Sequence, residues 1–384
     1  MRLAVIWIDW YAYHVARFRA LAEHPFFRTL GIELVGRAGV HEGQVFRHGE
    51  RDALNVVTLL PQANWSSTSQ FELARLLWKE LDAFDPEAVL VPGYYTLPGI
   101  SAALWAKKNG RRSILMTEST REDHFRVGWK EAFKKRILST LFYGAIAGGK
   151  RHRTYLEELG VSAAHIGQCY DVVDNDYYRT ECDALREVSD AAAAGLPANY
   201  FLYVGRIAPE KNLEQLIRAF GTYRALGGDW SLVLAGTGPD LDARRRQAAD
   251  SDFSTYIQFA GMKSTAELIA YYSFASAFVL PSSREPWGLV VNEAMAAGLP
   301  VIVSRVCGCA DDLVEHGGNG FLFDPREEGE LADMLCRMSR QGPERRKQMS
   351  AQSLRRIAGY SPRKWADEVA RICSSEHSPA WRTA

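Results

Sequence analysis

Short apolar segments and longer segments with helical spacing alternate along the first half of the chain. Apolar runs that suit buried strands occur at residues 3–8, 32–35, 55–60, 88–91 and 113–116. Helical spacing of apolar residues is found at residues 14–22, 71–84 and 100–108. Such alternation predicts a parallel sheet with helices on both of its faces. We expect residues 145–147 and 165–167 to continue the same domain.

A second alternation begins at residue 200. Predicted strands occupy residues 200–204, 231–235, 256–259, 278–280, 301–303 and 321–323. Predicted helices occupy residues 213–226, 240–249, 265–272, 289–297, 328–340 and 344–359. Two successive doubly wound α/β sheets predict a protein of two Rossmann-like lobes, with a ligand-binding cleft between them.

The segment between the two alternations is poor in large apolar side chains and is typical of a linker. The expected organisation is therefore an N-terminal lobe at residues 1–183, a linker at residues 184–199 and a C-terminal lobe at residues 200–358. A last amphipathic helix lies in the terminal segment 359–384. The length of 384 residues supports two lobes, because a chain longer than about 250–300 residues usually divides into more than one hydrophobic core.

The composition narrows the class of protein. Hydrophobic residues make up 47% and charged residues 24% of the chain, which is ordinary for a globular protein. The formal net charge is zero, so no global field favours nucleic acid, and we expect no nucleic-acid partner. The six cysteines include no CxxC pair, and Cys307-Gly-Cys309 supplies too few ligands for a zinc site. We expect no metal.

The start of the chain is apolar only as far as Ile8, because Asp9 follows. This run is too short for the core of a signal peptide. Elsewhere no apolar run reaches the ~20 residues of a membrane span. The expected location is the cytoplasm.

The densest group of candidate residues lies in the strand–loop–helix–strand unit at residues 278–303. Glu285 and Glu293 follow the carboxyl end of the first strand, where ligands bind in open α/β sheets. Gly288 lets the backbone approach a ligand, and the helix start after it suits a phosphate. Carboxylates accept hydrogen bonds from paired hydroxyls, so the chemistry suits a nucleotide sugar. Alternatively, both glutamates only stabilise the helix dipole, by ~0.3–1 kcal/mol each.

Two cations follow the first strand of the second lobe. Gly205 frees the turn, and Arg206 and Lys211 can converge on one anion before the helix that starts at residue 213. A pair of cations over a diphosphate would stabilise a leaving group as its charge develops. The alternative is a pair of surface cations beside Glu210 and Glu214, contributing under ~1 kcal/mol.

The glycine-rich loop at residues 235–239 follows a strand but lacks the third glycine of a dinucleotide fingerprint, since Leu241 and Asp242 stand there. The first strand of the first lobe is not followed by such a fingerprint either. An NAD-dependent oxidoreductase is therefore disfavoured, and we expect no cofactor.

The first lobe gathers titratable residues after the strand at 113–116. They are Glu118, Arg121, Asp123 and His124. Such density at the end of a strand favours a site, although a solvated charged loop would look the same. Asp171 and Asp174 follow later in the lobe and do not form the Asp-x-Asp of metal-dependent transferases. His14, at the start of the first helix, can donate a hydrogen bond or serve the structure alone.

Cations flank the apolar run at residues 137–147. They are Lys130, Lys134, Lys135, Arg136, Lys150, Arg151 and Arg153. One interpretation is a core helix or strand between solvated ends. The other is peripheral contact with anionic lipid headgroups at the inner face of a membrane.

Glu285, seven residues and Glu293, with Pro-Trp-Gly after the first glutamate and Ala-Met-Ala-Ala-Gly-Leu-Pro after the second, closely resemble the signature of retaining glycosyltransferase family 4 (glycosyl transferases group 1). The resemblance covers the second lobe well and the first mainly by layout. It implies the GT-B fold, in which the second lobe binds the donor, the first binds the acceptor and the terminal helices cross back to the first lobe.

The resemblance also implies roles for single residues. Arg206 and Lys211 would bind the donor diphosphate, and Glu293 would hold the ribose hydroxyls. Glu285 would bind a hydroxyl of the donor sugar. Backbone near Trp287, Gly288 and Leu289 would contact that sugar, and Met262 matches where the family holds the base. Trp287 could also be a core aromatic residue.

The first lobe departs from the family pattern. The usual glycine pair after the first strand is missing, because residues 9–14 occupy that loop. Glu118 stands near the position where many members have a histidine that faces the transferred sugar. The acceptor-side candidates are His14, Glu118, Arg121, Asp123, His124 and Asp171.

The implied activity is transfer of a sugar from a nucleoside-diphosphate sugar to a hydroxyl of a carbohydrate, lipid-linked or small-molecule acceptor. In the favoured family mechanism the acceptor attacks the front face, and the leaving phosphate helps take its proton. Positioning and charge stabilisation then supply most of the catalysis, with no metal. The alternatives are a nucleotide-sugar epimerase of GT-B fold and a non-catalytic nucleotide-binding protein.

Overall fold

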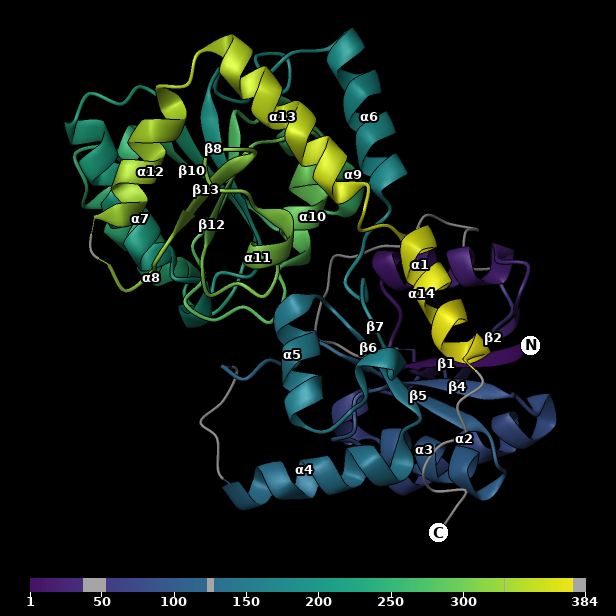
Figure 1. The fold of residues 1–384 in the computed structure, drawn as a ribbon. Coiled ribbons are helices and arrows are strands. Elements are labelled where there is room, and N and C mark those ends of the chain that lie inside the picture. The colour runs from purple at the N-terminus through teal and green to yellow at the C-terminus, as the bar shows by residue number, and fades with distance from the viewer. Residues whose placement is uncertain (37–52, 123–127, 328, 376–384) are drawn as a thin grey trace. The chain divides into compact units, whose positions relative to one another are not determined.

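The computed structural model describes residues 1–36, 53–122, 128–327 and 329–375. The chain divides into two compact units (Figure 1). Unit 1 comprises Met1–Val173 and Ser361–Ala384, and unit 2 comprises Asp174–Tyr360. The second boundary assigns the chain from Ser361 onward to unit 1.

Unit 1 contains a seven-stranded parallel sheet with the order β3-β2-β1-β4-β5-β6-β7. Its strands are β1 (Arg2–Trp7), β2 (Arg28–Val35), β3 (Val56–Leu60), β4 (Ala88–Pro92), β5 (Arg112–Thr117), β6 (Gly144–Ala147) and β7 (Ile166–Gly167). Its helices are α1 (Ala12–Glu23), α2 (Gln70–Phe84), α3 (Leu97–Lys108), α4 (Gly128–Leu141), α5 (Lys150–Glu158) and α14 (Pro362–Ser374).

The core of unit 1 forms because its central strands are mostly apolar and buried on both faces, whereas the edge strand β3 is only half-buried. Leu73, Leu77 and Leu81 give α2 one apolar stripe against the sheet, and the Ser69 side chain caps its start. The last helix, α14, packs beside α1 (Figure 1). Trp365 of α14 is fully buried, and its ring centroid lies 6.2 Å from that of Trp7.

Unit 2 contains a six-stranded parallel sheet with the order β10-β9-β8-β11-β12-β13. Its strands are β8 (Tyr200–Val204), β9 (Ser231–Ala235), β10 (Ile257–Gly261), β11 (Ala277–Leu280), β12 (Val301–Ser304) and β13 (Gly320–Phe323). Its helices are α6 (Asn175–Val188), α7 (Leu213–Ala225), α8 (Leu241–Ala249), α9 (Thr265–Phe274), α10 (Leu289–Ala296), α11 (Ala310–Leu313), α12 (Glu330–Ser339) and α13 (Pro343–Ile357). Two parallel α/β sheets confirm the predicted fold class.

The boundary between the units lies before α6, whereas the sequence places the first lobe up to residue 183 and a linker at 184–199. Arg186 shows why α6 belongs to unit 2: its guanidinium donates hydrogen bonds of 2.8 Å to the carbonyls of Ser273 and Ala297. Helix α6 also packs against α9 and α10. The first part of the expected linker is therefore the end of a docked helix.

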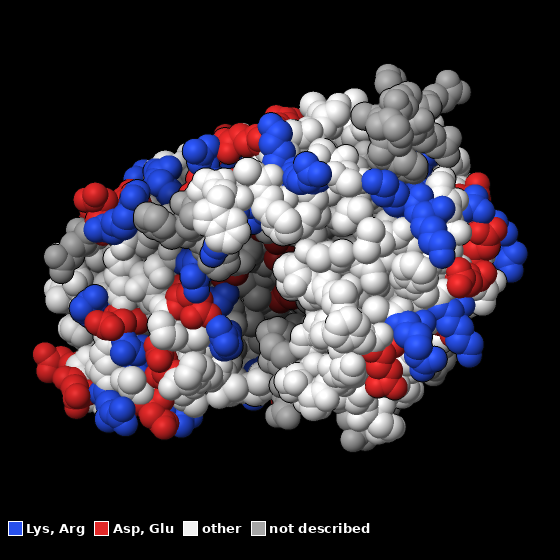
Figure 2. All heavy atoms as spheres, turned by 90° about the horizontal axis from the view of Figure 1, so that it is seen from below, with Lys and Arg blue, Asp and Glu red and all other residues white. Residues whose placement is uncertain are grey.

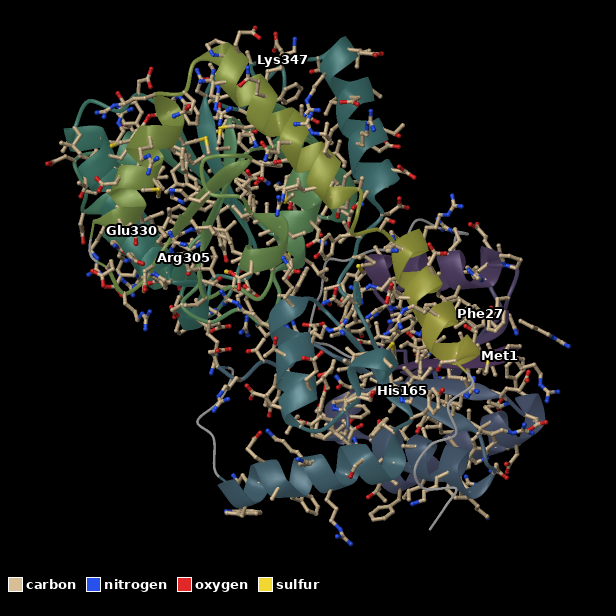
Figure 3. The ribbon with its side chains drawn as sticks, in the orientation of Figure 1. Met1, Phe27, His165, Arg305, Glu330 and Lys347 are labelled. Atoms are coloured by element: carbon tan, nitrogen blue, oxygen red, sulfur yellow. The ribbon has the colours of Figure 1, made fainter. Side chains whose placement is uncertain are left out.

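The carboxyl edge of the unit 2 sheet is easy to find in Figure 3. Arg305 directly follows β12, and Glu330 opens α12 after β13. The Glu330 carboxylate accepts a 2.7 Å hydrogen bond from the backbone N–H of Asp324, the residue after β13.

Positive and negative side chains are interspersed on the face seen in Figure 2, in keeping with the zero net charge.

Candidate functional site

Lys211 and Glu285 meet at the carboxyl edge of the unit 2 sheet. Lys211 ends the turn after β8, and Glu285 lies in the loop after β11. The Lys211 ammonium pairs with Glu285 Oε2, which also accepts a 3.0 Å hydrogen bond from Ser282 Oγ. The Glu285 side chain is nearly buried. Two residues that the sequence assigns to one ligand, 74 positions apart, are thus in direct contact.

Arg206 lies in the same turn and forms an ion pair with Glu210. Burial raises the pKa of Glu210, but hydrogen bonds and the charges of Arg206 and Lys211 outweigh burial and lower it. The backbone carbonyl of Glu210 accepts a 2.9 Å hydrogen bond from the N–H of Ser283, which follows β11. The turn that carries both cations is therefore tied to the loop that carries Glu285. More than half of the Arg206 side chain is exposed, so it is open to an anionic ligand.

Gly288 joins this loop to α10. Its φ of 103° lies in the left-handed region, and an added Cβ would come within 2.9 Å of Leu280 Cδ2. Leu289 is the first residue of α10, and the first N–H groups of a helix have no acceptor within it. These groups and the helix dipole favour an anion at this point.

The neighbouring turn after β12 fixes the path of the Glu285 loop. Gly308 N–H donates to the Glu285 carbonyl at 3.0 Å, and Cys309 N–H donates to the Trp287 carbonyl at 3.2 Å. Such bonds on both sides of Pro286 hold the loop in place. The backbone around Trp287, Gly288 and Leu289 is thus positioned before any ligand binds.

Trp287 is almost fully buried within unit 2. Its Nε1 donates a 2.9 Å hydrogen bond to Asn292 Oδ1, and its ring centroid lies 6.0 Å from that of Tyr360. The indole therefore serves the core of unit 2, which leaves the Trp287 backbone for any contact with a sugar. Met262 follows β10 directly and is about half exposed, beside Gly261, whose φ is 73°.

Glu293 lies in the middle of α10 and is buried. It accepts a 2.7 Å hydrogen bond from the Tyr272 hydroxyl of α9 and a further one from Tyr178 of α6. Burial raises the pKa of Glu293 to about 7, although both tyrosine hydrogen bonds lower it. Near neutral pH this carboxyl can either accept hydrogen bonds only or also donate one.

Of the acceptor-side candidates of unit 1, Glu118 and Asp171 interact directly, whereas Arg121 pairs with another residue. Glu118 follows β5 directly and is exposed, and its carboxyl shares a hydrogen bond with Asp171. Asp171 itself is fully buried. Arg121 pairs with Glu158 of α5 at 2.8 Å on the surface. Asp123 and His124 lie outside the described residues.

His14 is buried on α1. Its Nδ1 accepts a 3.2 Å hydrogen bond from the Tyr11 N–H, and its ring stacks on Trp7 with the centroids 4.6 Å apart. Burial and the nearby Arg17 charge lower its pKa well below the usual value for histidine. The imidazole is therefore neutral and helps to fix the start of α1.

Sequence reasoning missed the groups that hold the candidate carboxylates in place. Tyr178 and Tyr272 bind Glu293, and the fully buried Arg17 lies 3.5 Å from Asp171. The position of Arg17 offered one indication: it stands between Val15 and Phe18 on a helix whose other buried residues, apart from His14, are apolar. The role of the two tyrosines could not be predicted from the sequence, because tyrosine is a common buried residue in helices.

The described residues were searched for metal-binding groups and for membrane-spanning helices. No group of three or more histidine, cysteine, aspartate and glutamate side chains is arranged to hold a metal ion there. Among the same residues, no helix combines the length and apolar character needed to cross a membrane.

Comparisons with known proteins identify the fold of the chain and a family that unit 2 matches. Residues 187–356 match the family described as Glycosyl transferases group 1. The structure of Anabaena Alr3699/HepE in complex with UDP superposes with a TM-score of 0.71 at 18% identity, covering 97% of this chain and 100% of that chain. The architecture is thus GT-B, with two Rossmann-like units.

Two curated relatives resemble part of the chain. The GDP-mannose-dependent alpha-(1-6)-phosphatidylinositol monomannoside mannosyltransferase of Mycobacterium tuberculosis is 30% identical over 173 residues, which are 43% of this chain and 44% of that protein. The alpha-monoglucosyldiacylglycerol synthase of Acholeplasma laidlawii is 34% identical over 175 residues, or 45% and 42%. The matched part spans less than half the length of each relative.

Proposed function

We propose that the chain is a retaining glycosyltransferase of family 4, which moves a sugar from a nucleoside-diphosphate sugar to an acceptor hydroxyl. The observation that carries the proposal is the contact between Lys211 and Glu285 beside the start of α10. A cation, a carboxylate and free helix N–H groups at one sheet edge suit a diphosphate attached to a polyhydroxylated sugar.

The donor would lie with its diphosphate near Arg206, Lys211 and the start of α10. Charge that develops on the leaving phosphate would be stabilised by these groups, in a site arranged before the reaction begins. Glu285 would orient the sugar through a hydroxyl, and Glu293 would hold the ribose hydroxyls. No protein nucleophile is required in this account, since the leaving phosphate takes the acceptor proton.

The match of residues 187–356 to a glycosyltransferase family supports the transferase over the epimerase and over a non-catalytic binding protein. The donor base is open between two classes. One relative is named for GDP-mannose, whereas a structural neighbour was solved with UDP.

We also propose that the acceptor is a carbohydrate or a lipid-linked one, reached at an anionic membrane surface. Trp129 and Phe133 lie one turn apart on α4 and expose 69% and 60% of their surface. Lys130 Nζ lies 5.7 Å from the Trp129 ring centroid. Exposed aromatic residues beside cations suit the headgroup region of an anionic bilayer. The two relatives named above for lipid products are consistent with this acceptor class.

The test is an assay of nucleotide release and product formation with UDP-glucose, UDP-galactose, UDP-N-acetylglucosamine and GDP-mannose. Each donor is offered with a lipid extract and with methyl glycosides, and the anomeric proton of any product is examined by NMR. We expect release of one nucleotide and a product that keeps the donor's anomeric configuration. An inverted product would overturn the retaining mechanism, and isomerised donor without transfer would favour the epimerase.

A further inference from the structure

Arg17 is a fully buried charged side chain in unit 1. It lies on α1, between the rings of Tyr13 and Tyr170 at 4.9 and 4.7 Å from their centroids. Its Nε donates to the Val172 carbonyl at 3.1 Å, but neither terminal nitrogen donates a hydrogen bond within the described part of the chain. Burying a guanidinium whose donors have no acceptor costs free energy of folding. The presence of such a group therefore suggests that it serves a function.

The charge of Arg17 acts on Asp171. The closest approach is 3.5 Å, from Arg17 Nη2 to Asp171 Oδ1, and both side chains are fully buried. Asp171 is in turn hydrogen-bonded to Glu118. Burial and the Glu118 charge raise the pKa of Asp171 well above its usual value, against the effect of Arg17. Asp171 can therefore carry a proton and donate it in the hydrogen bond to Glu118.

This chain of contacts runs from the core to the surface at the carboxyl edge of the unit 1 sheet. Arg17 and Asp171 are buried, whereas Glu118 is exposed where it follows β5. Tyr95, in the turn after β4, exposes 78% of its surface and lies within electrostatic reach of Glu118. Because β4 and β5 are neighbouring parallel strands, Tyr95 and Glu118 follow strand ends at the same edge of the sheet. An exposed carboxylate and an exposed aromatic ring there suit one pyranose: the carboxylate can accept two hydroxyls, and the ring can cover a C–H face.

We propose that Glu118 and Tyr95 form the acceptor subsite for an unphosphorylated pyranose ring, and that Arg17 is its positioning residue, acting through Asp171. The proposal deepens the proposed glycosyltransferase function, on which it rests, and it lies wholly within unit 1. A phosphate on the acceptor ring at this point would face the Glu118 carboxylate, since the Arg17 guanidinium is buried. The subsite therefore selects a neutral sugar.

The experiment measures binding of simple sugars to the full chain without any donor. Saturation-transfer NMR is used with methyl α-D-mannopyranoside, methyl β-D-glucopyranoside, methyl β-D-galactopyranoside and mannose 6-phosphate. We expect at least one methyl glycoside to bind and the phosphorylated sugar to bind more weakly. The substitutions Glu118→Ala and Tyr95→Ala should each weaken binding about tenfold. Glu122→Ala, in the same loop, and Phe71→Ala, another exposed aromatic, should leave binding unchanged.

Two variants separate positioning from a purely structural role. Asp171→Asn keeps the size of the side chain, and Arg17→Lys keeps its positive charge. Thermal unfolding shows whether each variant folds. We expect folded Asp171→Asn, whose amide N–H can still donate to Glu118, to retain most of the glycoside binding, and folded Asp171→Ala to bind several-fold more weakly. Arg17→Lys should retain more binding than Arg17→Met.

Three results would overturn the proposal: no methyl glycoside binds to folded wild-type chain, binding survives both Glu118→Ala and Tyr95→Ala, or mannose 6-phosphate binds best. Calorimetry with UDP and GDP on the same samples tests unit 2 separately. A chain that binds nucleotide but no glycoside would thus contradict this subsite and leave the transferase proposal standing.

Discussion

The Tyr272 hydroxyl donates a 2.7 Å hydrogen bond to Glu293 Oε2, and both side chains are buried in unit 2. Burial raises the pKa of Glu293 to about 7, well above the value of about 4.3 for an unfolded chain. Between these values the native chain holds a proton that the unfolded chain releases. The free energy of unfolding therefore decreases as the pH rises through this window, and the loss is complete above the native pKa.

Glu293→Gln removes this titration while keeping the size of the side chain. We expect the stability of the variant relative to wild type to improve by up to about 3 kcal/mol between pH 4.5 and pH 8. Guanidinium unfolding of unit 2 at several pH values measures the difference. Glu187→Gln, at an exposed position of α6, is the matched control and should show no such trend. A difference for Glu293→Gln that stays constant with pH would contradict the account.

Gly288→Ala should destabilise unit 2. The φ of 103° is unfavourable for any residue with a Cβ, and the new atom would lie 2.9 Å from Leu280 Cδ2. We expect a loss of about 1–3 kcal/mol in the free energy of unfolding. Gly342→Ala serves as the control, because an added Cβ there meets no atom within 4 Å. Equal stability of the two variants would show that the Gly288 backbone relaxes.

The Lys211–Glu285 pair should appear as an energetic coupling in the chain without ligand. A double-mutant cycle with Lys211→Met and Glu285→Gln isolates the pair. Because Glu285 is nearly buried, we expect a coupling of about 1–3 kcal/mol in the free energy of unfolding. The exposed pair of Arg218 and Glu214 provides the comparison, with an expected coupling below about 0.5 kcal/mol. Similar couplings in both pairs would argue against a preformed Lys211–Glu285 contact.

Contact with anionic lipid is tested by sedimentation with vesicles of phosphatidylglycerol and phosphatidylcholine. Binding should increase with the phosphatidylglycerol fraction and decrease with salt. Trp129→Ser with Phe133→Ser should reduce binding at least tenfold, since both aromatic side chains lie exposed on α4. Phe71→Ser replaces an even more exposed aromatic residue, on α2, and should have no effect. Binding that is equal for neutral vesicles would contradict the proposed membrane contact.

The strands were predictable because burial on both faces requires continuous apolar runs. The run at residues 200–204, for example, coincides with β8. Helix α6 was missed because it turns mostly polar residues to solvent, with Tyr178 and Cys182 as its buried positions. Its end was read as linker for the same reason. Helix packing of this kind depends on partners distant in sequence, which periodicity does not report.

The candidate site was predictable where spacing carries the information. Glu285, Gly288 and Glu293 lie around the start of α10, as a strand–loop–helix pattern requires. Sequence left two readings open for Trp287, because an aromatic residue suits a core and a sugar equally; its burial decides for the core. Arg17 was missed although its position among the apolar residues of α1 pointed inward, since a charged residue in a helical pattern is normally exposed.

In the proposed function, unit 2 holds a nucleoside diphosphate at Arg206, Lys211 and Glu293. Calorimetric titration of the full chain with UDP and with GDP tests it most directly. We predict that one nucleotide binds clearly and that Arg206→Ala and Glu293→Ala each weaken it at least tenfold, while Arg218→Ala does not. Failure of both nucleotides to bind the folded chain, or undiminished binding by the two variants, would contradict the account.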